Sequence, residues 1–505
     1  MMSPLAEVVV QGFRVEAQRP WSRVIVTPEV WKFATKQLTE GHLTLLGLWA
    51  DGDAVHMALL NEEPIDIGVI TIECANGCFP SVGAAHPPAL RLERAIRDLY
   101  GLEPEGSPDQ RCWLDHGRWG IRHPLGAHQN ASQLLGPYRF LPVEGDSLHQ
   151  IPVGPVHAGI IEPGHFRFTA SGETVVRLEQ RLGYVHKGIE ALMVGADLNR
   201  AARLAGRTSG DSTVAYGIAF AHAVESALRL EIPKRAAWLR ALMAELERLA
   251  NHFGDFGAIC NDASFSLMHA QCGMLRERTL RAANDSFGHR LMMDLVIPGG
   301  IAADLSPDGA THMKRLLGDI ADRLSKLVEL YDNTASLQDR TVATGILRPS
   351  LARQFGAAGF VGRASGRSFD TRHAIRYAPY DELKLDIPVL EEGDVNARVW
   401  IRIREIEQSI ALIEQILDHL PDGPFLAATT CNSETSEGLG LAEGFRGDVL
   451  AWVRIDSAGR IARCHLRDPS WFQWPLLEAA IEGNIVADFP LCNKSFNCSY
   501  SGHDL

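Results

Sequence analysis

The stretch that decides the fold covers residues 204–225 and reads LAGRTSGDSTVAYGIAFAHAVE. Its first nine residues are mostly small and predict a turn, and the apolar spacing that follows predicts an amphipathic helix. A second stretch rich in small residues closes the chain at 488–505 and reads DFPLCNKSFNCSYSGHDL. The interpretation of the whole chain depends on these two stretches together.

Length and composition describe an ordinary globular protein. At 505 residues the chain predicts two or three domains, and its 46% hydrophobic and 22% charged content supports a well-buried core. The formal net charge of −13 argues against a nucleic-acid-binding surface, which needs clustered basic residues. No uninterrupted apolar run approaches the roughly 18 residues of a membrane span. We therefore expect a soluble, cytoplasmic chain whose membrane association comes only through partner subunits.

The nine cysteines do not have the spacing of a metal site. No two stand as Cys-x-x-Cys, and only Cys74 with Cys78 and Cys492 with Cys498 are close in sequence. An odd total with wide scatter is also unlike a disulfide framework. Buried or incidental thiols are favoured over metal ligands.

Residues 1–125 read as a small α+β domain. Short β-branched runs at 8–10, 24–26, 43–46 and 69–72 predict strands, and helix-like spacing appears at 30–35. In the segment 89–101, Leu92, Ile96 and Leu99 fall on one helical face and Gly101 is placed to end the helix. That pattern alone places the polar residues of this helix, Glu93, Arg94 and Asp98, toward solvent.

After a linker at 126–150, residues 151–505 read as a mainly helical domain. It opens with strand-like sequence and a predicted hairpin at Ser171-Gly172, and long apolar stripes at helical spacing then run through 239–253, 313–330 and 399–417. A strand is predicted at 450–455. The fold class is therefore α+β: a small N-terminal α+β domain followed by a helical bundle with a β entry and minor C-terminal strands.

Several motifs in order resemble known families. The segment 89–101 and Trp113-Leu-Asp-His-Gly-Arg-Trp119 resemble the C subunit of respiratory complex I (NADH-quinone oxidoreductase). The second domain resembles the complex I D subunit and the large subunit of energy-converting nickel-iron hydrogenases of the formate-hydrogenlyase and hydrogenase-4 kind. Its supporting segments are Gly183-Tyr-Val-His-Lys-Gly-Ile-Glu190, Ala244–His252, Asp255–Ala258, Gly362–Gly366 and Arg467-Asp-Pro-Ser470. The resemblance implies a fused C/D-type subunit.

In the hydrogenases, two Cys-x-x-Cys pairs hold the nickel-iron centre. Matching Arg207 and Glu225 places Ser209 and Ser212 at the first pair, and matching the C-terminal stretch places Ser499 and Gly502 at the second. Serine hydroxyls do not replace soft thiolates, and glycine offers no side chain. We expect this chain to hold no metal of its own. Asp211, between two former ligand positions, is a candidate for a site rebuilt for another purpose.

The complex I resemblance implies a quinone held between a His and a Tyr. Here those positions align with Ile161 and Gly210, whose side chains cannot hydrogen-bond a quinone oxygen. Asp255, with His157 or Arg207 beside it, is then a candidate proton relay, and an ion pair that fixes helix packing is the alternative. The aligned secondary cation position of hydrogenases carries Glu162 and His503, for which surface or structural roles are expected.

Arg363 stands with other charged residues in a Gly-rich loop, which in these families faces a small iron-sulfur subunit; its companions are Arg367, Asp370 and Arg372, and Arg248 and Arg340 are further candidates. The loop residues either tune a partner's cluster or form a solvated or interdomain salt-bridge network.

The resemblance implies a core subunit of a membrane-associated oxidoreductase that takes electrons from a partner's [4Fe-4S] cluster and passes them to quinone or another acceptor, coupled to ion translocation. Expected partners are the small iron-sulfur subunit and antiporter-like membrane subunits, with the chain held at the inner face of the cell membrane. A working hydrogenase and a purely structural subunit are the alternatives.

Overall fold

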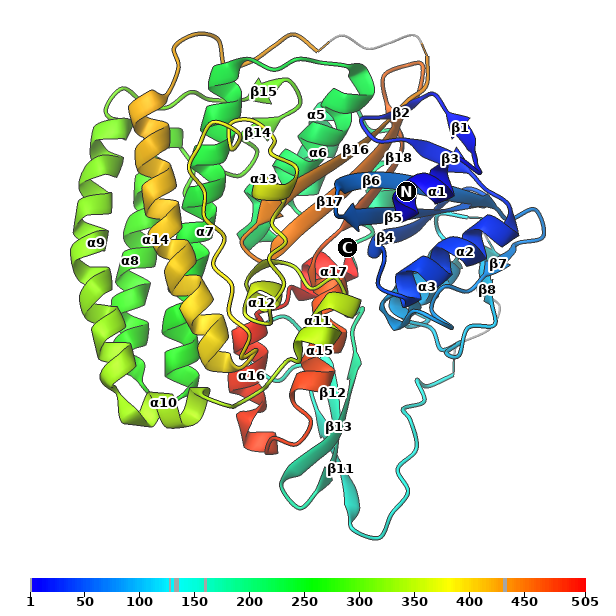
Figure 1. Cartoon of the computed structure of the whole chain (residues 1–505), viewed down its shortest axis with the longest axis horizontal. Coiled ribbons are helices and arrows are strands. Elements are labelled where there is room, and N and C mark those ends of the chain that lie inside the picture. Colours follow the sequence, from blue (N-terminus) through cyan, green and yellow to red (C-terminus); the bar gives the residue numbers. More distant parts are fainter. Residues whose placement is uncertain (1, 127–128, 131–135, 159–160, 430–433) are drawn as a thin grey trace.

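The computed structural model describes every residue except 1, 127–128, 131–135, 159–160 and 430–433. Figure 1 shows three parts: an N-terminal sheet domain, a bundle of long helices on the opposite side, and a C-terminal sheet between them. A narrow antiparallel sheet projects away from this body.

The N-terminal part is built on a five-stranded sheet with the order β1-β3-β6-β5-β4. The predicted strands at 24–26, 43–46 and 69–72 and the helix at 30–35 are confirmed, but residues 8–10 belong mostly to a helix. The elements are α1 (Pro4–Val9), β1 (Phe13–Val15), β2 (Gln18–Arg19), β3 (Arg23–Ile25), α2 (Pro28–Thr39), β4 (Thr44–Asp51), β5 (Ala54–Glu62), β6 (Ile65–Glu73), β7 (Cys78–Pro80), α3 (Leu90–Tyr100) and β8 (Glu103–Glu105).

Helix α3 confirms the predicted span and ends at Gly101, whose φ of 77° suits a residue without a side chain. Its polar face, however, is not in solvent. Glu93 accepts hydrogen bonds from the backbone of Val82 and Gly83, and Asp98 accepts three from residues 113–115. The prediction that these side chains are exposed was wrong, because the loops on either side fold over the helix and use its carboxylates as backbone acceptors.

The segment that joins the two halves leads into the projecting sheet. Its elements are β9 (Ile121–Arg122), β10 (Gln129–Asn130), β11 (Leu148–Val153), β12 (His165–Ser171) and β13 (Thr174–Arg181). The predicted hairpin at residues 171–172 is confirmed as the β12–β13 turn. Part of the predicted linker, 127–128 and 131–135, lies outside the described residues, and its last residues already belong to β11.

Helices α7, α9 and α14 lie where the apolar stripes predicted them, whereas no stripe predicted α8. The helix after the predicted turn at 204–212 is also confirmed, although residues 204–206 of that turn belong to α5. That helix, α6, is not amphipathic, because every residue except His222 and Ser226 is buried. The helices are α4 (Ile189–Met193), α5 (Leu198–Gly206), α6 (Thr213–Leu228), α7 (Lys234–Asp262), α8 (Ser266–Phe287), α9 (Gly309–Asn333), α10 (Ala335–Thr341), α11 (Pro349–Gln354), α12 (Gly359–Arg363), α13 (Thr371–Ala374) and α14 (Val395–His419), with a small β14–β15 hairpin (Val296–Ile297, Gly300–Ile301).

A C-terminal sheet joins the two halves of the molecule. Its order is β18-β17-β16-β2, so a strand of the N-terminal part completes it. Arg23 pairs with Glu437 at 2.8 Å across this junction, and Trp49 packs against Trp452. The sequence predicted only part of this sheet. Its elements, and those that follow, are β16 (Ser436–Gly444), β17 (Gly447–Ile455), β18 (Ile461–Arg467), α15 (Ser470–Ala480), α16 (Phe489–Phe496) and α17 (Tyr500–Asp504).

Within the described residues, none of the helices combines the length and apolar character needed to cross a membrane.

Candidate functional site

The two small-residue stretches meet in the folded chain. Ser209 lies in the turn before α6 and Ser499 is the N-cap of α17, and their hydroxyl oxygens are 3.0 Å apart. The Ser499 hydroxyl also accepts a hydrogen bond from the backbone N–H of Gly502 at 2.8 Å. Three of the four positions matched to hydrogenase ligands are thus in direct contact, although Ser209 is 290 residues before Ser499 in sequence.

Asp211 joins Ser212, the remaining matched position, to this group. Its carboxylate accepts hydrogen bonds from Ser209 at 2.8 Å and from Ser212 at 3.3 Å, and Arg446 donates two more at 2.9 and 2.6 Å. Burial alone would raise the pKa of Asp211, but the charge and hydrogen bonds of Arg446, with the Ser209 hydrogen bond, outweigh it and hold the pKa well below its usual range. The aspartate is therefore an anion bound to a buried guanidinium. We call Ser209, Asp211, Ser212, Arg446 and Ser499 the serine–aspartate cluster.

The residues present do not fit a nickel-iron centre. The cluster offers hydroxyls and a carboxylate in place of soft thiolates, and the buried cation of Arg446 already pairs with the carboxylate. A Cβ at Gly502 would lie 2.4 Å from the Asp468 carboxylate, which Tyr216 holds with a hydrogen bond of 2.8 Å. A cysteine thiolate at position 502 therefore has no room.

Cys, His, Asp and Glu side chains do not gather into a metal site elsewhere in the described ranges. No group of three or more of these residues is placed there to hold a metal ion. Cys492 and Cys498 are both buried, and burial raises the pKa of the Cys492 thiol to about 12.

Beside Asp211 lies a small cavity of about 180 Å³, lined by Glu247 and Asn251 of α7 and by Arg276 of α8, among others. Glu247 accepts hydrogen bonds from the first backbone N–H groups of α6, Val214 at 2.7 Å and Ala215 at 3.1 Å. Burial nevertheless raises the pKa of Glu247 to about 8, and the charge of Asp211 adds to the shift. The cavity thus brings together one carboxylate that stays ionised and one that holds a proton near neutral pH.

Asp255 does not join Arg207 or His157, as the proposed relay required. It pairs with Arg402 at 3.2 Å and accepts a hydrogen bond from Asn497 at 2.9 Å. That grouping was wrong, because the α7–α14 contact places the Arg402 guanidinium beside Asp255. Arg207, for its part, pairs with Asp294 at the surface and makes no hydrogen bond to the cluster.

His157 does lie close to the C-terminal stretch. Its Nε2 is 3.2 Å from the hydroxyl of Tyr500, the residue after Ser499, and burial lowers its pKa. Glu162 accepts the backbone N–H of Ser501 at 3.0 Å, while His503 is fully buried and stacks on Trp471. Ile161 is 43% exposed.

Of the two alternatives for the Gly-rich loop, the structure has a salt-bridge network, but it is buried within residues 151–505 rather than solvated, and of the loop's arginines Arg367 pairs with the N-terminal part, through Glu62 at 2.7 Å. Arg363 is fully buried and pairs with Glu405 at 2.7 Å, Glu443 at 3.0 Å and Asp370 at 3.1 Å. Arg367 and Arg372 are buried as well. Arg363 therefore does not face a partner. We call Arg363, its three carboxylates, Glu245, Arg248 and Arg372 the arginine network.

Two family models match the chain. The respiratory-chain NADH dehydrogenase 30 Kd subunit matches residues 24–133, and the 49 Kd subunit matches residues 264–437. Formate hydrogenlyase subunit 5 of Escherichia coli is 32% identical over 436 residues, covering 84% of this chain and 77% of that protein. The chain belongs to the family of fused C/D-type subunits shared by complex I and these hydrogenases.

Two further relatives are a complex I subunit and a chain of a solved respiratory complex. On the complex I side, the NADH-quinone oxidoreductase D 1 subunit of Roseiflexus is 31% identical, covering 67% of this chain and 94% of that protein. Among solved structures, a chain of the membrane-bound sulfane sulfur reductase, an archaeal respiratory membrane complex, aligns with a TM-score of 0.68 and 25% identity; the alignment covers 72% of this chain and all of that one. The family assignment made from the motifs is confirmed.

Sequence reasoning missed Arg446, Glu247 and Asp468. Asp468 stands in the quoted segment 467–470, so the motif was seen without its role. Arg446 occupies a turn between β16 and β17 with no periodic pattern around it, and no signal in the sequence distinguishes it.

Proposed function

We propose that this chain is a core subunit of a membrane-associated oxidoreductase complex and that it works without a nickel-iron centre of its own. Electrons come from a [4Fe-4S] cluster on a small partner subunit and pass to a quinone or another acceptor, and antiporter-like membrane subunits move ions in response. Its relatives are subunits of membrane respiratory and hydrogenase complexes.

The observation that carries the proposal is the serine–aspartate cluster. Its three serines occupy positions matched to metal ligands, yet hydroxyls, a carboxylate and a guanidinium satisfy one another there. A polar site of this kind moves protons more readily than it binds soft metals. The side chain of Asp211 is 36% exposed in this chain, so the cluster reaches the surface beside Glu247.

Reducing a quinone to a quinol takes two electrons and two protons. The partner's cluster supplies the electrons one at a time, and Glu247, which holds a proton near neutral pH, lies beside Asp211 to supply protons. Asp211→Asn should therefore slow proton-coupled turnover of the complex, whereas Asp294→Asn, which removes a surface carboxylate from Arg207, should not. Equal turnover in wild type and Asp211→Asn would remove Asp211 from the mechanism.

The purified complex tests the larger proposal. We expect nickel far below one atom per chain, and reoxidation of the reduced [4Fe-4S] cluster on adding quinone, followed by electron paramagnetic resonance. Stoichiometric nickel with hydrogen evolution would establish the hydrogenase alternative. A cluster that no quinone reoxidises would leave the structural alternative.

A further inference from the structure

A pocket of about 440 Å³ lies at the end of the β12–β13 pair where His165 is opposite Arg181. The segments 111–116 and 136–140 complete its walls, and the serine–aspartate cluster contributes no residue to it. Burial lowers the pKa values of its two histidines, His116 and His165, so they add no charge at neutral pH. A volume within roughly 300–1,000 Å³ is typical of a small-molecule site.

The lining of this pocket carries more positive than negative side chains. Arg111, Arg139 and Arg181 stand against one carboxylate, that of Asp115, which is itself 3.3 Å from the Nε of Arg122. The chain as a whole has a net charge of −13, so the sign of the charge at this pocket is opposite to that of the protein. The pocket therefore attracts anions that the rest of the surface repels.

Two of the three arginines have no carboxylate of their own. Arg111 is paired with Asp109 and Glu179. The Arg181 guanidinium is buried and donates to the backbone carbonyls of residues 112, 113 and 115. Among the described residues, no Asp or Glu lies within ion-pair distance of Arg139 or Arg181, and the residues that the structure does not describe include no Asp or Glu.

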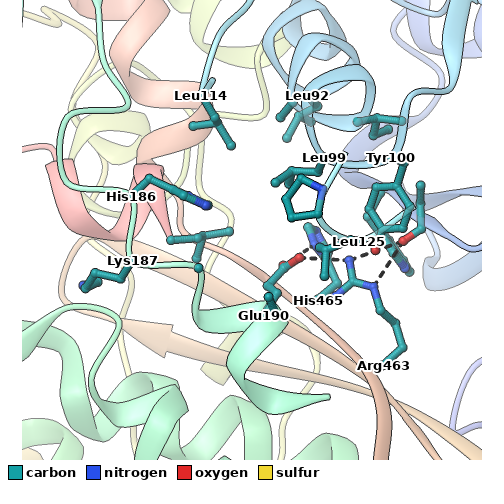
Figure 2. Close-up of a pocket in the computed structure, with 18 of the residues that line it drawn as sticks. Leu92, Leu99, Tyr100, Leu114, Leu125, His186, Lys187, Glu190, Arg463 and His465 are labelled. Atoms are coloured by element: carbon teal, nitrogen blue, oxygen red, sulfur yellow. Dashed lines mark hydrogen bonds and ion pairs between the residues drawn. The ribbon is translucent and has the colours of Figure 1, made fainter. Parts of the chain in front are cut away.

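Arg463 shows how a carboxylate compensates a buried arginine elsewhere in the chain. In the cavity of about 290 Å³ drawn in Figure 2, Glu190 binds Arg463 at 2.9 Å. Burial lowers the pKa of an arginine, but the charge of Glu190 outweighs burial and raises the pKa of Arg463. The pKa of Arg181 is instead lowered, because burial dominates and the charge of Arg94 adds to it. A bound anion would stabilise the charge of Arg181 as Glu190 stabilises that of Arg463.

The groups that are open to a ligand indicate which anion fits. Arg139 is exposed and Tyr184 is 38% exposed, so a guanidinium and a phenol hydroxyl can both donate to a ligand. The ring of Tyr138 lies 4.3 Å from the guanidinium carbon of Arg181 and 5.0 Å from that of Arg111. Guanidinium groups match carboxylate and phosphate oxygens. A single carboxylate group is small for this volume, whereas a diphosphate has oxygens for several donors.

We propose that this pocket binds an anion that carries a diphosphate group, held by Arg139 and Tyr184 and attracted by the charge of Arg181. A soluble diphosphate and the phosphate of an anionic lipid head group share this chemistry, and the test separates them. The site is independent of the proposed redox function, and its test does not require turnover.

Isothermal titration calorimetry of the full-length chain with inorganic pyrophosphate is the direct test. We expect one pyrophosphate per chain, bound more tightly than monophosphate. Arg139→Gln removes an exposed guanidinium and should weaken pyrophosphate about five- to tenfold, the worth of one charge-assisted hydrogen bond, without unfolding the protein. Arg323→Gln makes the same change of charge at an exposed position of α9 and should leave the affinity unchanged.

Two further measurements locate the site and identify the source of the phosphate. Asp115→Asn removes the one carboxylate among the described lining residues and keeps the oxygen that accepts from Gly117, so it should strengthen pyrophosphate about threefold. Flotation with vesicles of phosphatidylcholine and phosphatidylglycerol tests the lipid: vesicle binding that pyrophosphate displaces assigns the pocket to a lipid head group, and any other outcome assigns it to a soluble diphosphate.

The proposal is overturned if pyrophosphate does not bind or binds no better than monophosphate. It is also overturned if Arg139→Gln binds pyrophosphate as the wild type does, or if Asp115→Asn weakens the binding.

Discussion

Two polar clusters contact different faces of α7 and differ in how far they open to the surface. The arginine network includes Glu245 and Arg248 of α7 and is buried, with its charged side chains at most 3% exposed. The serine–aspartate cluster contacts Asn251 and lies beside Glu247, and its aspartate is 36% exposed. The comparison separates buried charge within the bundle from charge that is partly exposed beside a cavity, where we propose that protons are exchanged.

The sharpest test of the sealed cluster is Arg363→Met. It leaves Glu405, Asp370 and Glu443 without their shared cation, so the free energy of unfolding should fall by about 3–5 kcal/mol. Chemical denaturation followed by circular dichroism measures this. Arg404→Met, which breaks an exposed pair with Glu407 on the same α14 helix, should cost less than about 1 kcal/mol. Similar losses in both variants would mean that the network is not sealed.

The sequence predicted the bundle around this network well. Helices α7, α9 and α14 keep apolar residues at helical spacing over many turns, and such a pattern has one structural solution. It did not predict β16, whose Ser-Glu-Gly-Leu-Gly-Leu sequence lacks β-branched residues. The structure gives the reason: a Cβ at Gly438 or Gly440 would lie 1.8 or 2.2 Å from carbonyl oxygens of α6, so this strand must be glycine-rich where the helix packs.

The candidate site was likewise predicted only in part. The family motifs placed Ser209 and Ser499 at two matched ligand positions, and the structure places their hydroxyls in contact. Arg446 was missed because a single charged residue in a turn carries no pattern. Glu247 stands in the quoted segment 244–252, so the motif was seen without the role of this residue; tertiary contacts alone give both residues their partners.

Glu247, beside the serine–aspartate cluster, should make the free energy of unfolding depend on pH. The folded-state pKa of Glu247 is about 8, above the unfolded value of about 4.3, so the stability it contributes is complete below about pH 4 and is lost as the pH rises through 8. Relative to Glu247→Gln, which has no such proton, the wild type should lose about 3–4 kcal/mol between about pH 5 and pH 8. Urea unfolding across this range measures it, and parallel curves for the two proteins would contradict the assignment.

Asp211→Asn tests the same pH dependence of urea unfolding from the neighbouring charge. The charge of Asp211 raises the pKa of Glu247, so its removal should shift the upper end of the pH-dependent loss to lower pH. Asp294→Asn removes a carboxylate from a surface pair instead and should leave the curve in place.

A substitution that adds one carbon tests whether position 502 has room for a ligand side chain. Gly502→Ala places a Cβ 2.4 Å from the Asp468 carboxylate and 2.9 Å from the Ser499 hydroxyl, so it should destabilise the protein by about 1–3 kcal/mol. At Gly210, the position aligned with the family's tyrosine, a Cβ meets nothing within 4 Å, and Gly210→Ala should change the stability by less than about 0.5 kcal/mol. Thermal unfolding of the two variants measures the difference. Equal midpoints would mean that position 502 has room for a side chain.

The smallest effect expected is at the contact between the two stretches. Ser499→Ala removes the hydroxyl that accepts from Gly502 and contacts Ser209, but Ser209 keeps its hydrogen bond to Asp211. The loss should therefore be about 0.5–1.5 kcal/mol, that of one N-cap hydrogen bond. Ser501→Ala is the control, because its hydroxyl lies 3.5 Å from Ser499 and should contribute little. A cost above about 3 kcal/mol for Ser499→Ala would mean that this hydroxyl anchors the whole cluster, and the distinction between an exchanging site and a sealed one would no longer hold there.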